Sequence, residues 1–331
     1  MKQPIEKRLA GMTVLASTFL LSACGDPSDA PGGPAGIPEA PDAAIQTVAR
    51  EFGGGNTGIL WQAMPASYQS DVNGIVQLAG GKFDAEIYNK SFELIARIGE
   101  VAKQQTTFLL NNQFLAQQPE EERADLEAAI PALADLLTTI SNSEIASVEG
   151  LQAFDGQDFF ENTLAKLSDD IADLSKLSEE EVPSMADLKD VTVSVVEQAD
   201  GTATLQLSMP GEEPQTEVFT QVEGRWVPQE IAAEWAMSMA EAQANLEAIT
   251  PEEIAAQKPQ IMGVLTMFEG VLNQLEAAET QEQFDQALQG AMMPIMGLMM
   301  MGQGGGMGAP QQQMPQSPQM PPAPPAPVPA Q

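Results

Sequence analysis

The sequence predicts an α+β fold that is mostly helical and contains one small antiparallel β-meander of three or four strands. Two regions, 43–177 and 229–288, carry apolar residues at intervals of three and four, the spacing of one helix face. Between them, at about 190–228, the apolar period falls to two, which is typical of strands with one buried face. We therefore expect one folded body at 43–290, with the meander inside it.

The helical elements follow from apolar spacing and from residues that begin helices. Asp84 is placed to cap the helix that follows it. Glu120-Glu121-Glu122 favours a helix start, because acids stabilise the positive end of the helix dipole. Thr250-Pro251-Glu252-Glu253 combines a cap, a proline and two acids, although Pro259 could interrupt the helix that it starts. The expected helices cover about 43–52, 57–64, 66–78, 84–110, 119–140, 159–177, 229–249, 250–278 and 280–288.

The meander is predicted from alternation and turn residues. Val191, Val193 and Val195 alternate with polar residues, and Asp200-Gly201 is a strong hairpin turn. The end of the stretch reads Val222-Glu223-Gly224-Arg225-Trp226. It resembles the sheet of NTF2-like domains, whose strands often end in Val-x-Gly-x-Trp. This resemblance implies helices before the sheet, whereas this chain also continues with helices after it.

The N-terminal residues combine a basic start, an apolar run and the chain's one cysteine. Residues 1–8 carry the basic charge, and 9–20 are apolar, which is shorter than the roughly 20 residues of a membrane-spanning helix. Leu21-Ser22-Ala23-Cys24 comes next. The segment resembles the lipobox of bacterial lipoproteins, Leu-(Ala/Ser)-(Ala/Gly)-Cys.

This resemblance implies a cleaved signal peptide at 1–23 and a membrane anchor at Cys24, which would carry diacylglycerol and an acyl chain such as palmitate. Two or more chains hold a protein stably on a membrane, whereas one binds only marginally. Residues 24–42 would then form a Pro/Gly-rich tether. Gly25, in place of the Asp that retains lipoproteins in the inner membrane, implies the outer membrane, facing the periplasm or the cell surface.

The charge balance is strongly acidic. The chain holds 14 Lys and Arg against 47 Asp and Glu, and its formal net charge is −33. This balance argues against a nucleic-acid partner and against binding to anionic lipid through a basic patch. Attachment to a membrane must then come from lipid. The acidity serves either solubility or the binding of cations or a basic partner.

The tail at 291–331 is rich in Met, Gly, Gln and Pro, and we expect low-complexity disorder there. Met292, Met296, Met299 and Met300 are candidate ligands for Cu(I), because thioether sulfur is a soft donor. The competing interpretation is that these methionines pack as flexible apolar side chains or form an adaptable surface.

Catalytic patterns are weak. The chain has no histidine, and lipid on Cys24 would remove its thiol as a nucleophile. Acid pairs at Asp155/Asp158 and Asp169-Asp170 could serve acid–base chemistry, but turns and helix caps also use such residues. The aromatic residues that could line a binding site, or pack as core, are Trp61, Tyr68, Tyr88, Trp226 and Trp235.

The sequence therefore predicts a non-catalytic, membrane-anchored lipoprotein of the bacterial cell envelope with a binding or structural role. We expect no cofactor, and a protein partner in the envelope. The alternatives are a Cu(I)-binding envelope protein that uses the methionine cluster, and a carboxylate-dependent envelope hydrolase.

Overall fold

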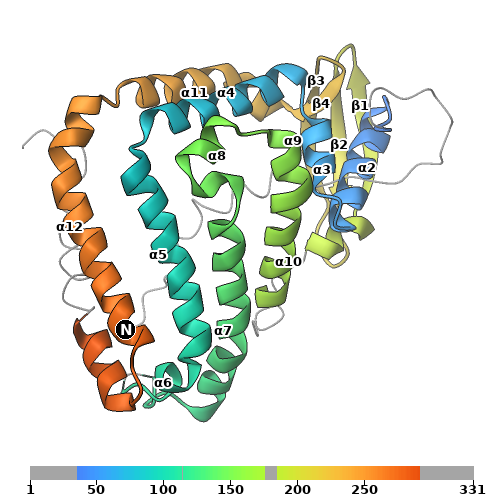
Figure 1. Ribbon diagram of the computed structural model, residues 1–331. Coiled ribbons are helices and arrows are strands. Elements are labelled where there is room, and N and C mark those ends of the chain that lie inside the picture. The colour runs from blue at the N-terminus through green and yellow to red at the C-terminus, as the bar shows by residue number, and fades with distance from the viewer. Residues whose placement is uncertain (1–35, 114, 176–184, 291–331) are drawn as a thin grey trace, which may run out of the picture. The chain divides into compact units, whose positions relative to one another are not determined.

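The computed structural model describes residues 36–113, 115–175 and 185–290. It confirms the predicted fold class: most of the described chain is helical, and one four-stranded antiparallel sheet lies between helical regions of the sequence (Figure 1). The helices are α2 (Pro41–Gly53), α3 (Gly58–Ala63), α4 (Ala66–Lys82), α5 (Ala85–Gln104), α6 (Thr106–Leu110), α7 (Glu120–Ser141), α8 (Val148–Gln152), α9 (Gly156–Asp158), α10 (Leu164–Ser175), α11 (Gln229–Glu247) and α12 (Pro251–Glu276).

Shorter helical pieces complete this part of the chain. They are two 3₁₀ turns, η1 (Glu144–Ala146) and η3 (Met185–Asp190), the π-helical turn η2 (Phe159–Thr163), and a last helix at 281–290.

The sheet is a meander in sequence order: β1 (Thr192–Ala199), β2 (Thr202–Ser208), β3 (Gln215–Val222) and β4 (Arg225–Pro228). Gly201 and Gly224 have φ of 75° and 78° in the two tight turns, a conformation in which a Cβ is strained. The predicted alternation holds for Val191 and Val193, which are buried. It fails at Val195, which is 39% exposed although it keeps the register of Val193; the register shifts directly after it, between Val195 and Glu197.

The first core lies between one face of the sheet and helices α2 and α3. Ile37 belongs to it and is only 5% exposed, so the predicted tether boundary at residue 42 is wrong and the folded body includes residue 37. Pro41 then begins α2, where its missing N–H costs no helical hydrogen bond. The buried members are Ile37, Ala44, Ile45, Val48, Phe52, Ile59, Leu188, Val191, Val193, Ala203, Leu205, Leu207 and Phe219.

The second core lies among the long helices. Helix α12 packs on α5, α5 on α7, and α7 on α10 (Figure 1). The buried cluster joins α5, α12 and the last helix through Leu94, Val101, Leu272, Leu275, Ala278, Phe284 and Ala287. Helix α10 has no buried residue, and Ile171 on its predicted apolar stripe is 50% exposed.

Ion pairs reinforce the contact between α5 and α12. Lys90 Nζ lies 2.6 Å from Glu269 Oε1, and Arg97 bonds both carboxylate oxygens of Glu276. Asp84 caps α5 by accepting from the N–H groups of Glu86 and Ile87, and its other oxygen accepts from Lys258 Nζ at 2.9 Å. The predicted caps at Asp84 and Thr250 are therefore confirmed, and Pro259 lies inside α12 without ending it.

Two adjacent glycines of α4 should respond oppositely to alanine. A Cβ on Gly80 would lie 2.7 Å from Gln152 N, whereas a Cβ on Gly81 meets no atom within 4 Å. We expect Gly80→Ala to lower the free energy of unfolding by about 1–3 kcal/mol. Gly81→Ala should raise it by up to about 1 kcal/mol, because alanine is the better helix former. Urea unfolding of both variants measures this, and equal effects would contradict the packing of α4 on α8.

Asp84 should make a pH-dependent contribution to stability. The hydrogen bond from Lys258, followed by those from the helix N–H groups, lowers the pKa of this carboxyl below its ordinary 3.8. Its stabilisation is therefore present above pH 3.8 and is lost as the pH falls through the depressed folded pKa. Asp84→Ala should cost about 1–2 kcal/mol at neutral pH. Asp84→Asn should cost less because the amide oxygen still caps the helix.

Urea unfolding of the three proteins at a series of pH values tests this account. The difference in the free energy of unfolding between the wild type and Asp84→Asn should be largest at neutral pH and should disappear in acid. A difference that stays constant across this pH range would refute the role of the Lys258 pair.

Candidate functional site

Helices α4 and α11 lie along each other and enclose a groove on the surface of the described chain. Helix α11 leaves β4, contacts β3 and β4 at its start, and then follows α4 toward α12 (Figure 1). The groove between α4 and α11 has a volume of about 340 Å³. It is lined by Ser70, Asp71, Gly74, Ile75, Leu78, Met239, Gln243 and Glu247.

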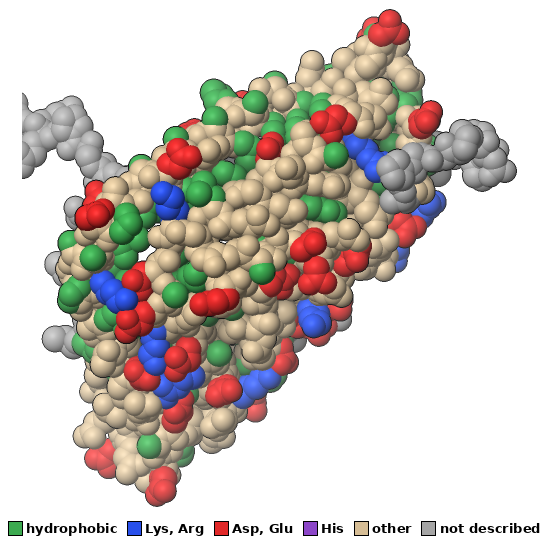
Figure 2. All heavy atoms as spheres, turned by 45° about the horizontal axis from the view of Figure 1, so that its top comes forward, with side chains coloured by type: hydrophobic (Ala, Val, Ile, Leu, Met, Phe, Trp, Pro, Cys, Tyr) green, Lys and Arg blue, Asp and Glu red, His purple; other side chains and the backbone are tan. Residues whose placement is uncertain are grey.

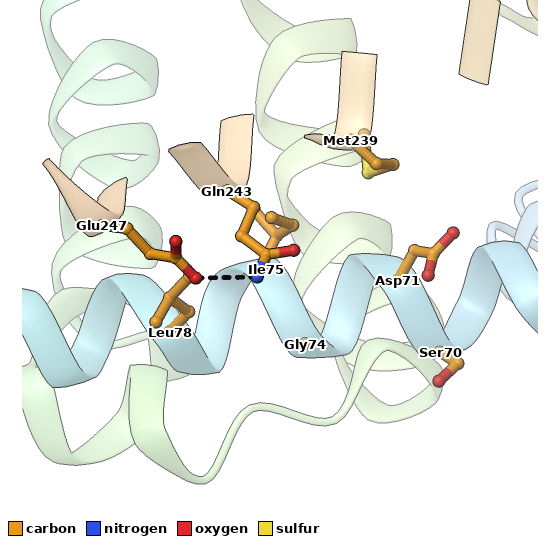
Figure 3. A pocket seen from close by; sticks show the side chains of 8 residues that line it. All are labelled: Ser70, Asp71, Gly74, Ile75, Leu78, Met239, Gln243 and Glu247. Carbon is orange, nitrogen blue, oxygen red and sulfur yellow. Dashed lines mark hydrogen bonds between the residues drawn. The ribbon is translucent and has the colours of Figure 1, made fainter. Parts of the chain in front are cut away.

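The groove has carboxylates at its two ends and apolar side chains between them. Asp71 lies at one end and Glu247 at the other (Figure 3). Asp71 Oδ2 accepts a hydrogen bond from Trp235 Nε1 at 2.8 Å, and Glu247 Oε1 accepts one from Gln243 Nε2 at 2.8 Å. The first bond joins α11 to α4 and the second lies within α11, and together they hold both carboxylates at the groove.

A second, smaller cavity of about 90 Å³ lies at the start of the same two helices. Tyr68 stacks on Trp235 with ring centroids 3.9 Å apart and planes 7° from parallel. Trp226 lines the same cavity and donates from Nε1 to Glu39 O at 2.8 Å. The other lining residues are apolar: Ile45, Val48, Ala63, Met64, Pro65, Phe219, Val227 and Pro228.

Local sequence explains why these elements meet. Pro65 and Pro228 immediately precede α4 and α11, so each helix starts from an extended residue next to the sheet. Glu223, in the β3–β4 turn, accepts from the N–H of Ser67 at 3.0 Å and so binds the turn to the N-terminus of α4. This bond lowers the pKa of Glu223. Burial, and then the charges of Asp71 and Glu223, raise the pKa of Tyr68.

The structure brings together three of the five aromatic residues singled out in the sequence: Tyr68, Trp226 and Trp235. The other two have packing roles. Trp61 is 5% exposed and its ring contacts Gly156, where a Cβ would clash. Tyr88 donates its hydroxyl to Ile145 O at 2.7 Å.

The groove residues themselves were not predicted from the sequence. Asp71 and Trp235 are hydrogen-bonded across 164 positions, and no local pattern predicts which helix covers α4. The one hint is Gly74, a glycine in a helix interior, where a Cβ would meet nothing within 4 Å.

The predicted acid pairs do not come together as a site in the described residues. Asp155 caps α9, and Asp158 accepts from Asn162 at 2.7 Å. Asp169 and Asp170 lie on α10. Within 36–113, 115–175 and 185–290, no group of three or more Asp, Glu, Cys or His residues is arranged to hold a metal ion.

The remaining predictions concern residues that the structure leaves undescribed. Cys24 and the candidate copper ligands Met292, Met296, Met299 and Met300 lie outside the described residues. Among the helices of the described part, none is both long enough and apolar enough to cross a membrane. Comparison of the chain with protein-family models, with curated proteins and with solved structures finds no match.

Proposed function

We propose that this chain is a non-catalytic binding protein of the bacterial cell envelope, held on the outer membrane by lipid on Cys24. The observation that carries the proposal is the segment Leu21-Ser22-Ala23-Cys24, placed directly after a short apolar run and a basic start. An acyl anchor of two or more chains gives stable attachment without a spanning helix.

The charges of the folded part support an anchor made of lipid. Four of its basic residues, Lys90, Arg97, Lys103 and Lys258, are engaged in ion pairs with acids. On the face drawn in Figure 2, acidic side chains are spread widely, and the basic ones are fewer and lie mostly beside them. Such a surface is repelled by anionic lipid headgroups, so it would not hold the protein on a membrane by itself.

The junction of α4, α11 and the sheet supports a binding role. Ligand sites are typically concave and mostly apolar, with a few polar groups that orient the ligand. The groove and the aromatic cavity are both lined by residues of α4 and α11. Asp71 lines the groove, Trp235 lines the cavity, and the two side chains are hydrogen-bonded to each other. The groove is open and has apolar side chains between two carboxylates. This combination fits a ligand-binding site better than a packed contact between two helices.

Substitution of Cys24 tests the anchor. Cys24→Ser should abolish incorporation of an alkyne fatty acid and release the protein from the membrane fraction, because a hydroxyl does not replace the thiol that is lipidated. Ser22→Ala is the matched control: it keeps the lipobox pattern and should be labelled and membrane-bound like the wild type. Labelling and membrane association of Cys24→Ser at the wild-type level would overturn the proposal.

A further inference from the structure

We propose that the groove between α4 and α11 binds a linear aliphatic diamine or polyamine, a methylene chain with protonated amines near its two ends. The inference deepens the binding role proposed above and rests on it. It is carried by the arrangement of charge, apolar surface and open space along the groove.

The carboxylates are spaced for a ligand with two separated charges. Asp71 and Leu78 both line the groove and are seven positions apart on α4, which is about 10 Å along the helix axis. Glu247 lies at the Leu78 end of the groove (Figure 3). A ligand with one ammonium group would meet only one of these acids, whereas an extended diamine of this length meets both.

The surface between the carboxylates fits methylene groups. Ile75 and Leu78 project from α4, and Met239 projects from α11 across from them (Figure 3). Apolar contact with a methylene chain removes apolar area from water, and the methionine side chain adapts to an irregular chain. Gln243 lies between the two carboxylates, and its amide oxygen can accept a hydrogen bond from an inner amine (Figure 3).

The charge of the groove selects a cation. Asp71 and Glu247 are the acids that line it, and Lys82 is the one base on α4 or α11. Lys82 Nζ lies 3.4 Å from the backbone oxygen of Glu247. Within the part of the chain that the structure describes, neither Asp71 nor Glu247 forms an ion pair, so an incoming ammonium would displace no protein cation.

Gly74 keeps the groove open. It lies in the interior of α4, where glycine destabilises a helix relative to alanine. It lines the groove, and a Cβ there would meet no atom within 4 Å, so close helix packing does not explain it. A large side chain at this position would project into the space between the two carboxylates.

The test uses isothermal titration calorimetry of the full-length lipidated protein in detergent, with octamethylenediamine, spermidine, putrescine and octylamine as probes. Octamethylenediamine and spermidine should bind more tightly than putrescine, which is too short to reach both acids, and than octylamine, which has one charge. Added salt should weaken binding. Asp71→Asn and Glu247→Gln should each weaken it by about threefold to tenfold.

Two matched controls separate a site from general attraction to an acidic surface. Glu241→Gln removes the same charge from α11, two positions from Gln243 and therefore on the opposite side of the helix. It should leave the affinity within about twofold of the wild type. Gly74→Leu should abolish binding, whereas Gly81→Leu, also in open space on α4 but outside the groove, should not. Circular dichroism should show that all variants are folded.

Three outcomes would overturn the proposal: no binding of any diamine at millimolar concentration, an equal loss of affinity in Glu241→Gln and Glu247→Gln, or unchanged binding in Gly74→Leu. None of them bears on the anchor, because fatty-acid labelling of Cys24 is measured independently of the groove. Failure of the diamine-binding proposal can therefore be distinguished from failure of the lipid-anchor proposal.

Discussion

The packing of α11 along α4 is the constraint on which the arrangement of the site depends. Its central contact is the stack of Tyr68 on Trp235, with Trp235 also donating to Asp71. Stacked aromatic pairs stabilise by about 0.5–1.5 kcal/mol beyond the area that they bury. Because α11 starts at the end of β4 and leads into α12, its packing on α4 connects the sheet to the long helices.

The two cores differ in how they are held. The sheet and α2 bury large aliphatic side chains almost completely, with Leu205 at 0% and Leu207 at 1% exposure. The long helices instead pack in pairs, and polar contacts such as Arg97 with Glu276 supplement a smaller apolar cluster. Ile98, Leu133 and Ile171 remain about half exposed on this layer. Four bases of this layer, Lys90, Arg97, Lys103 and Lys258, form ion pairs that join one helix to another.

Elements that are specified locally were predictable from the sequence. The Asp84 cap, the Thr250 capping box and the Asp200-Gly201 hairpin each depend on a few adjacent residues. Misses came where tertiary contacts prevailed. Ile37 sits in a Pro/Gly-rich stretch and is nevertheless buried, and Val195 is exposed although the alternation places it on the buried face of the sheet. The aromatic residues of the site were recognisable by type, but their meeting depends on the pairing of two distant helices, which apolar spacing alone does not encode.

The most direct measurement of this account is a double-mutant cycle between Tyr68→Leu and Trp235→Leu, followed by urea unfolding. The stack predicts a coupling free energy of about 0.5–1.5 kcal/mol between the two positions. A coupling indistinguishable from zero would mean that the rings do not meet in solution. It would contradict the placement of α11 on α4, and with it the groove and the binding role inferred from it.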